Sequence, residues 1–383
     1  MTRDFAKQVW WGGAARRLAV LALLGAGCKA GTCGSGASGS GPLSEQERKG
    51  LPGVIAFVSE RAPQKDVWLV RPATGEQTQL TRGPEDEYPG APSPDGASLV
   101  VVAAAEVQGI HVEQLRLAPL DGGPVVMLAP PRGRARNPSW SPDGSWFVAE
   151  SDAQSFSDVV KQAPRENAEV TRLTEAPEGN FEPSVSPDGT QVAFVSSRTG
   201  DPEIYVMKAD GTDVRRLTSF HKEDMAPKWS PDGKRISFLS DREGRVRVFV
   251  VKPDGTDLRA VSGSQQTGEE REPVWSPDGK KLAFVGRAKD QKSRIWVADM
   301  AGGEPVALTD GKSTDDQPEW SPDGKYLAFA SERTGDVELF LMRANGSGQT
   351  QLTNTKGADW LPRWFVPKTL PPAGQGAGRA EGT

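Results

Sequence analysis

The sequence predicts an all-β protein, a seven-bladed β-propeller with four antiparallel strands in each blade, and three observations carry this prediction. The motif Ser-Pro-Asp-Gly occurs six times in the 383 residues, with successive copies 44 to 48 residues apart. Each copy is followed by strand-length runs of β-branched and aromatic residues, and another such run precedes it. The two ends of the chain carry complementary parts of one such unit. A repeat of about 45 residues with four strands is typical of a propeller blade.

The unit that follows Asp188 illustrates the pattern. Its runs are 191–197, 203–211 and 215–219, and the next inner run, 226–230, leads into the following motif. Valine, isoleucine and aromatic residues dominate these runs, as expected of strands. In three units a turn-forming pair follows the second run, as a tight hairpin requires. These pairs are Asp210-Gly211, Asp254-Gly255 and Asn345-Gly346.

The number of blades follows from the two ends of the chain. Runs 54–60, 66–72 and 78–82 correspond to the second, third and fourth strands of a unit that lacks an inner strand. Run 360–367 corresponds to an inner strand without a following motif. Pairing this C-terminal strand with the three N-terminal strands completes a seventh blade, joins the two ends of the chain by sheet hydrogen bonds and leaves no open ring.

Domain boundaries follow from the same alignment. We expect the propeller to span 54–366, with a flexible tether at 28–53 and a disordered tail at 367–383, both rich in Gly. The segment 157–175 lacks an Asp-Gly turn. The sequence therefore leaves open whether this third unit forms a full blade.

The N-terminus has the pattern of an export signal. Basic residues at Arg3, Lys7, Arg16 and Arg17 precede an apolar run at 18–27, and Cys28 follows. The apolar run is too short to cross a bilayer and matches the apolar region of a signal peptide. Residues 1–27 resemble a bacterial lipoprotein signal peptide, which implies that Cys28 becomes the lipidated first residue of the mature protein. Gly25 departs from the leucine that this pattern prefers.

Two other export signals stay open as alternatives, an ordinary cleaved signal and a twin-arginine signal. The resemblance implies an exported protein of the bacterial cell envelope. It would be a lipoprotein that is anchored at the outer membrane and faces the periplasm; the cell surface is the alternative location. Cys33 is the only other cysteine, so no disulfide framework is predicted.

The regular copies of the repeat read PxWSPDGxxLAFxS, followed by an Asp-Gly turn and Leu-Thr. This pattern resembles the propeller repeat of the TolB family, a WD40-like repeat, over nearly all of 54–366. The resemblance implies a protein that works by binding partner proteins. The α/β domain that precedes the propeller in TolB has no counterpart in the 53 residues before the first run. The sequence therefore looks like a stand-alone, lipid-anchored form.

Some enzymes carry related propellers, but the catalytic motifs and metal ligands of these enzymes are not found in this sequence. Prolyl-oligopeptidase-type enzymes add a hydrolase domain, and the sequence contains no G-x-S-x-G motif. Oligogalacturonate lyases use a metal with histidine ligands, whereas His111 and His221, the only histidines, lie more than two repeat periods apart. We therefore expect no catalytic residues, no cofactor and no metal. The alternative is an envelope enzyme or glycan-binding protein that uses an acidic channel mouth, with or without a metal.

Composition restricts the partners. The formal net charge is -5, with 25% charged and 36% hydrophobic residues, which fits a soluble globular chain. A net acidic chain argues against nucleic acid as the main partner. We expect a monomer that binds a protein or peptide in the cell envelope and contacts the membrane through its lipid anchor only.

Carboxylates recur just before the inner runs, at what would be the mouth of the central channel. An acidic face there would suit a cationic segment of a partner or a Ca²⁺ ion, and a set of solvated loops is the alternative. The candidate binding residues are Asp86, Glu87, Glu223, Asp224, Glu269, Glu270, Asp315, Asp316 and Asp359.

The aspartates of the repeated motif are predicted to be structural turn residues. One aspartate per blade around one rim is too widely spaced for shared metal coordination. Pro, Asp and Gly in succession favour a tight turn, because Pro sets φ, Asp bonds to nearby backbone and Gly accepts positive φ. These residues are Asp95, Asp143, Asp188, Asp232, Asp278 and Asp323. The tryptophans of the inner runs are predicted to pack between blades.

Overall fold

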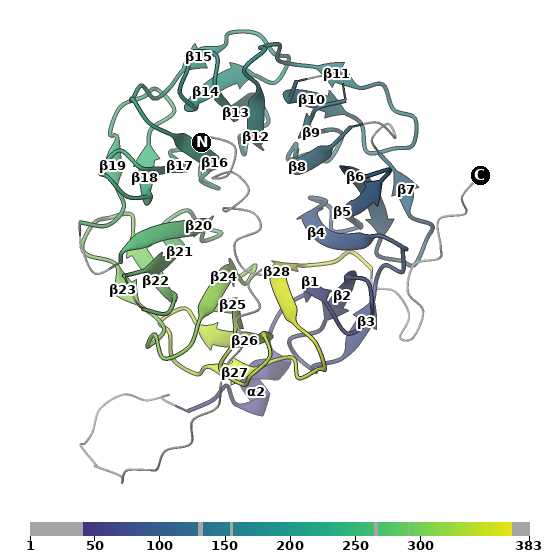
Figure 1. The fold of residues 1–383 in the computed structure, drawn as a ribbon. Coiled ribbons are helices and arrows are strands. Elements are labelled where there is room, and N and C mark those ends of the chain that lie inside the picture. Colours follow the sequence, from purple (N-terminus) through teal and green to yellow (C-terminus); the bar gives the residue numbers. More distant parts are fainter. Residues whose placement is uncertain (1–40, 129–132, 154–155, 264–266, 290, 370–383) are drawn as a thin grey trace. The chain divides into compact units, whose positions relative to one another are not determined.

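The computed structural model describes residues 41–128, 133–153, 156–263, 267–289 and 291–369. These residues form seven four-stranded antiparallel sheets, arranged as blades around a central axis (Figure 1). The C-terminal strand pairs with the first of the three N-terminal strands and completes their blade. The predicted seven-bladed propeller and its mode of closure are confirmed.

Each blade has an inner, a second, a third and an outer strand, counted from the axis outward. The inner strands are β28 (Asp359–Phe365), β4 (Asp86–Pro92), β8 (Ala135–Trp140), β12 (Asn180–Val185), β16 (Asp224–Trp229), β20 (Glu269–Trp275) and β24 (Asp315–Trp320). The second strands are β1 (Val54–Ser59), β5 (Ser98–Val107), β9 (Phe147–Ser151), β13 (Gln191–Ser196), β17 (Ile236–Ser240), β21 (Lys281–Arg287) and β25 (Tyr326–Ser331).

The third strands are β2 (Asp66–Val70), β6 (Ile110–Pro119), β10 (Asp158–Gln162), β14 (Glu203–Lys208), β18 (Arg247–Val251), β22 (Arg294–Asp299) and β26 (Glu338–Arg343). The outer strands are β3 (Gln77–Gln79), β7 (Val126–Met127), β11 (Thr171–Arg172), β15 (Arg215–Arg216), β19 (Arg259–Ala260), β23 (Val306–Ala307) and β27 (Thr350–Gln351). Blade 1 combines β28 with β1, β2 and β3, and blades 2 to 7 follow in chain order. Blade 3 is a complete sheet of four strands, although it lacks the Asp-Gly turn.

Most second and third strands are largely apolar and buried, because both faces of a blade pack against neighbouring blades; β6 and β10 contain more polar residues. All residues of β17 and β18 are buried. The tryptophans of the inner strands lie in the layers between blades. Trp320, for example, packs with Ile295 and Leu308 of blade 6 and with Phe329 of blade 7. Its Nε1 donates to the carbonyl oxygen of Val274 in blade 6 at 3.1 Å, so the predicted packing between blades is confirmed.

The repeated Ser-Pro-Asp-Gly motifs form the turns between inner and second strands. In blade 5, Ser230 Oγ and the backbone N–H of Lys234 both donate to Asp232 Oδ1, at 2.6 and 3.1 Å. Gly233 has φ +70°, a left-handed conformation that favours glycine. The serine-to-aspartate bond recurs in all six copies. Each of these aspartates thus stabilises a local turn on one side of the ring, which we name the turn face.

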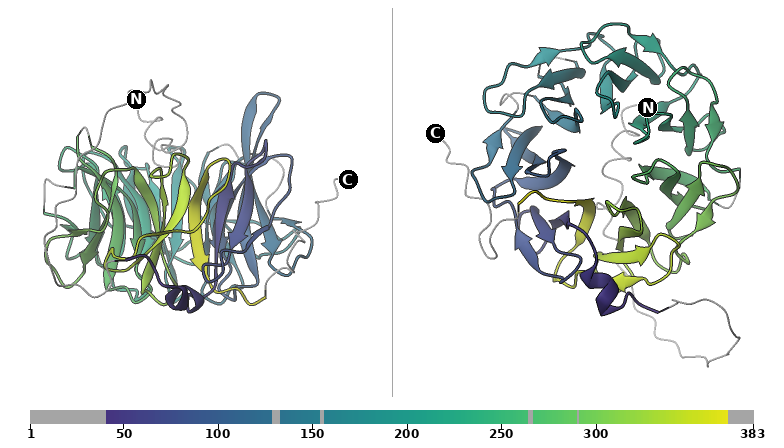
Figure 2. Two further views of the ribbon diagram at one scale, coloured as in Figure 1. Left: turned by 90° about the horizontal axis from the view of Figure 1, so that it is seen from below. Right: turned by 180° about the vertical axis from the view of Figure 1, so that it is seen from behind.

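The opposite side, the loop face, carries the connections between blades. The hairpin of β5 and β6, with ten residues in each strand, projects from the loop face (Figure 2, left). Val107 and Ile110 at its tip are 53% and 66% exposed. No helix in the described part of the chain is long and apolar enough to cross a membrane.

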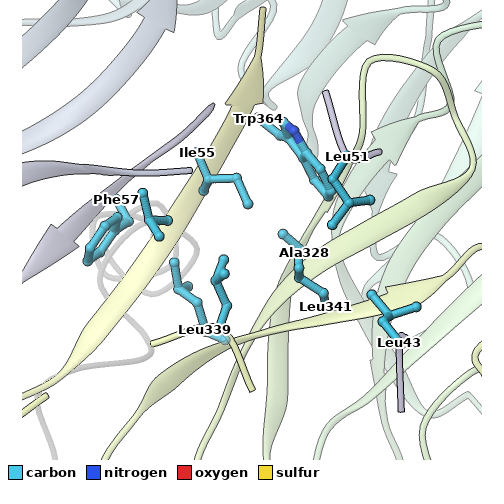
Figure 3. Packing of buried hydrophobic residues seen from close by; sticks show 11 residues of the cluster. Leu43, Leu51, Ile55, Phe57, Ala328, Leu339, Leu341 and Trp364 are labelled. Carbon is cyan, nitrogen blue, oxygen red and sulfur yellow. The ribbon is translucent and has the colours of Figure 1, made fainter. Parts of the chain in front are cut away.

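Closure of the ring involves both backbone pairing and apolar packing. β1 pairs with β28 from Val54 opposite Phe365 to Ser59 opposite Asp359. Ile55 of β1 and Trp364 of β28 belong to one buried cluster, which also includes Leu339 and Leu341 of β26 in blade 7 (Figure 3). The first and last parts of the folded chain therefore share one core.

A short helix, α2 (Glu45–Lys49), adds to this closure on the turn face (Figures 1 and 2). Ser44 and Glu47 form a capping box, and Glu47 also pairs with Arg343 of β26 through two contacts of 2.9 Å. Leu43 and Leu51 on either side of α2 are buried in the same cluster as Ile55 and Trp364, which we name the closure cluster. The sequence reading missed this helix, which lies within the segment expected to be a tether.

Candidate functional site

Five of the nine predicted channel-mouth carboxylates are buried inside their blades, with exposed fractions of 2% or less. These are Glu87, Asp224, Glu270, Asp315 and Asp359. Asp315 accepts from Ser331 Oγ at 2.6 Å and from Arg333 Nη2 at 2.7 Å. Asp359 makes the same pair of contacts with Ser59 and Arg61, and Asp224 pairs with Arg242 at 2.6 Å. We name this arrangement the Asp-Ser-Arg clamp.

The arginine of each clamp also lies over aromatic rings of the second and third strands. Arg333 lies 5.1 Å from the ring centroid of Phe329 and 4.7 Å from that of Phe340. Blades 1, 4, 5 and 7 share this stacking, and blade 4 uses an asparagine, Asn180, in place of the aspartate. A cation over a ring and a buried carboxylate both stabilise the guanidinium. The clamp aspartates therefore hold the loop-face ends of their blades together.

The other predicted carboxylates do not converge. Glu87 pairs with Arg116 at 3.0 Å, and Glu270 accepts from Val248 N–H at 2.8 Å, each within its own blade. Asp86 pairs with Lys65 at 2.6 Å. Glu269 is exposed, and partial burial raises the pKa of Glu223.

Asp316 is the exception, because it links two blades. It pairs with Arg271 of blade 6 at 2.6 Å. Among the residues that the structure describes, no three His, Cys, Asp or Glu side chains are grouped so as to hold a metal ion. The binding role of the nine carboxylates stays a prediction.

A different set of side chains links the inner strands around the axis. In six inner strands the residue before the proline has positive φ, which marks a bulge; these are Asn137, Glu182, Ala226, Glu272, Gln317 and Leu361. Glu182 accepts from the backbone N–H of Ala226 in the next blade at 2.7 Å. Glu272 and Gln317 make the same contact to their next blades, also at 2.7 Å. These bonds tie neighbouring inner strands together.

The position after this proline varies around the ring, and in blade 2 the aligned residue follows Gly90 instead of a proline. The seven side chains are Ala91, Ser139, Ser184, Lys228, Val274, Glu319 and Arg363. Lys228 is exposed, and Arg363 Nη1 lies 4.0 Å from Glu319 Oε2 of the neighbouring blade. Arg363 of blade 1 influences the pKa of Lys228 in blade 5, of Glu272 in blade 6 and of Glu319 in blade 7. The inner strands that carry both sets of residues surround the axis of the ring (Figure 1), and we name the two sets together the channel wall.

The channel shifts the pKa of several of these groups toward neutrality. Removal from bulk water raises the pKa of Glu319 to about 7, against the opposing effect of Arg363. The same cause, together with the nearby Asp316, raises the pKa of Glu272 to about 7. Removal from water also raises the pKa of Glu182, and partial removal from bulk water lowers that of Lys228, whose side chain stays exposed inside the ring. The channel thus holds carboxyl groups that change charge near pH 7.

Comparison with known proteins identifies the family. The sequence profile of the TolB β-propeller domain matches residues 114–270 and 262–368. The chain belongs to this family.

Relatives of this TolB-type propeller match part of it. A TolB homolog from Chlorobium luteolum is 31% identical over 155 residues, which cover 40% of this chain and 34% of the homolog. An uncharacterized protein from Agrobacterium fabrum is 33% identical over 168 residues, which cover 42% of this chain and 56% of that protein. The matches thus span about a third and about half of the lengths of these relatives.

Solved structures share the fold. TolB from Acinetobacter baumannii has a TM-score of 0.53 at 22% identity, with 85% of this chain and 86% of that chain covered. Oligogalacturonate lyase from Vibrio parahaemolyticus has a TM-score of 0.60 at 14% identity, with 79% and 88% covered. At these identities the similarity shows a shared fold only, and the activity of the lyase cannot be transferred to this TolB-type propeller.

The charged residues of the channel wall were missed by the sequence reading. Glu182, Lys228, Glu272, Glu319 and Arg363 directly flank the proline of the inner strands. The signal that could have identified them was the variation in charge, from one copy of the repeat to the next, at the positions beside the proline. The proline, serine and most tryptophans recur, whereas the residues beside the proline change charge from copy to copy.

Proposed function

We propose that this TolB-family protein is a binding scaffold whose channel wall receives a polypeptide segment of a partner protein. The observation that carries the proposal is the asymmetry of the wall. The framework repeats seven times, but the aligned position that follows the proline in the other blades holds Ala91 in blade 2 and ranges elsewhere from Val274 to Lys228, Glu319 and Arg363. Seven equal blades could not orient a ligand, whereas unequal charges at fixed positions select one orientation of one segment.

The charges define the chemistry of that segment. Glu272 and Glu319 hold protons near pH 7 and ionise readily when a cation approaches. Lys228 is exposed in the channel and can receive a carboxylate. The proposed ligand therefore carries a lysine or arginine for the side of blades 6 and 7 and an acidic residue for blade 5. The family resemblance, which implies a protein that binds partner proteins, supports this reading.

We further propose that the protein is exported, non-enzymatic and monomeric, and that a lipid on Cys28 anchors it in the cell envelope. Residues 1–40, with the signal peptide, Cys28 and Cys33, lie outside the described residues, as does the tail from 370 onward. The described chain begins beside α2 on the turn face. A flexible tether that leaves from there would attach the propeller to the lipid from its turn-face side. Cys28→Ala is expected to release the protein from membrane fractions, and retention there would contradict the anchor.

Site-specific photo-crosslinking in envelope extracts tests the binding proposal. A photoreactive residue at Val274 in the channel wall is expected to capture one predominant partner. The same residue at Val306, which is 62% exposed on the outer strand of blade 6, serves as the matched control. Combining the Val274 probe with Lys228→Glu and Arg363→Glu should abolish capture. Equal capture from both positions, or capture that survives charge reversal, would overturn the proposal.

A further inference from the structure

Blade 3 differs from the clamp blades at every position of the clamp and its stacked rings except the serine. The repeat alignment places Ala135 where blade 5 has the clamp aspartate and Ala153 where it has Arg242. Ala149 and Val160, which are paired in β9 and β10, replace the two stacked aromatic rings. Only the serine, Ser151, is kept. One guanidinium, one carboxylate or carboxamide and two rings are thus absent from a position that four other blades fill.

A cavity of about 70 Å³ lies at this position. All five clamp-equivalent residues of blade 3 line it, together with Leu115 of blade 2 and Phe147 of β9. Ala135, Ala149, Leu115 and Phe147 are each 5% exposed or less. The lining is therefore mainly apolar and is held by the cores of two blades.

The polar groups at one end of the cavity already have partners. Asp158 accepts from Thr174 Oγ1 at 3.0 Å and from Asn180 Nδ2 at 2.9 Å, and it pairs with Arg172. Gln162 donates to the carbonyl oxygen of Leu128 at 2.9 Å. A water molecule needs two or more polar partners to be held in a cavity. The site therefore favours an apolar occupant over water.

We propose that this cavity, the blade 3 pocket, binds a small branched aliphatic group of a ligand. Size decides between an aliphatic group and a whole aromatic ring. A cavity of about 150 Å³ lined by apolar side chains binds benzene, and the blade 3 pocket has about half that volume. An isobutyl or isopropyl group is the chemistry that fits. This site is separate from the channel wall and does not depend on the function proposed there.

Methyl-resolved NMR of the full-length protein tests the proposal, with xenon and N-acetyl-leucinamide as probes. Both are expected to give saturable shifts of the Leu115, Ala149 and Val160 methyl signals. N-acetyl-asparaginamide, of similar shape but polar, should give none. Ala149→Leu fills the pocket and should weaken binding of either probe at least about tenfold. Ala301→Leu, the same change at an exposed turn of blade 6, should leave binding unchanged.

The result that would overturn the proposal is equally direct. Shifts that do not saturate, that spread over the surface, or that persist in Ala149→Leu would show that no aliphatic group binds in the pocket. If Ala149→Leu does not fold, Ala149→Val is the smaller substitution, and unchanged binding of N-acetyl-leucinamide in this variant would also contradict the proposal.

Discussion

Arg363 Nη1 and Glu319 Oε2 lie 4.0 Å apart, across the junction between the strand that closes the ring and the inner strand of blade 7. Their side chains are 30% and 21% exposed, so the pair lies at the channel surface and not in the core. Arg363 also opposes the rise in the pKa of Glu272, one blade further on. The strand that closes the propeller therefore supplies Arg363, the cation that lowers the pKa of both Glu319 and Glu272.

The first prediction concerns the pH dependence of stability. The pKa of Glu319 is about 7 in the folded protein, above its ordinary value of 4.5. Between these values the folded state holds a proton that the unfolded chain has released, so the free energy of unfolding falls as pH rises from about 4.5 to 7. Glu319→Gln removes this loss. We expect the variant to gain about 1 kcal/mol relative to the wild type between pH 5 and pH 8, after allowance for screening by channel water.

Urea denaturation at a series of pH values measures this difference. Glu169→Gln, a change at an exposed glutamate of blade 3, is the control and should run parallel to the wild type. If the Glu319→Gln curve also runs parallel to the wild type, Glu319 does not hold a proton in the folded channel.

The second prediction uses the clamp of blade 5. Arg242→Met leaves the fully buried Asp224 without its cation, which is expected to cost about 3–5 kcal/mol. Asp224→Asn alone should cost about 1 kcal/mol or less, because Asn180 of blade 4 accepts from Arg198 at 3.1 Å in the same arrangement. Adding Asp224→Asn to Arg242→Met should recover part of the loss. Additive losses in the double variant would show that the two residues act independently.

The repeat made the fold predictable, but it did not indicate which contacts the inner-strand side chains make. Its spacing and the complementary chain ends were sufficient for seven blades, because each strand repeats a simple apolar pattern. The carboxylates of the inner strands could not be resolved in the same way. Asp315 and Asp316 are adjacent in sequence, but Asp315 is enclosed in the clamp while Asp316 reaches Arg271 of the preceding blade. Which neighbour a side chain contacts depends on the bulge in each inner strand. The bulged residue varies in type from Ala226 to Glu272, although a proline follows it in six strands.

Helix α2 was not predicted because it, too, depends on contacts with distant parts of the chain. Its only signal was the capping box of Ser44 and Glu47, which precedes a charged and not an apolar run. Five helical residues are too few to be stable alone, and they depend on the contacts of Leu43 and Leu51 with the closure cluster.

The third prediction concerns the tryptophans between blades. Trp320→Ala is expected to lower the free energy of unfolding by about 3–5 kcal/mol, because it leaves a cavity between blades 6 and 7. Trp320→Phe keeps most of the apolar volume but leaves the carbonyl of Val274 without its donor, and should cost about 1–3 kcal/mol. Urea denaturation with an unchanged m-value checks both. Similar losses for the two variants would assign the effect to the hydrogen bond alone.

The fourth prediction tests whether the segment around α2 supports closure of the ring. Leu51 is 5% exposed and belongs to the same cluster as Ile55 and Trp364. Leu51→Ala is expected to cost about 2–4 kcal/mol, since a buried leucine is lost from a packed cluster. Hydrogen exchange should then speed up first in β1 and β28, the pair that closes the ring, because their packing depends on this cluster. Leu258→Ala removes the same side chain from a site that is 42% exposed and should change stability by no more than about 0.5 kcal/mol. If exchange in β1 and β28 is unchanged in Leu51→Ala, backbone pairing alone holds the ring closed and α2 is only an attachment to its surface.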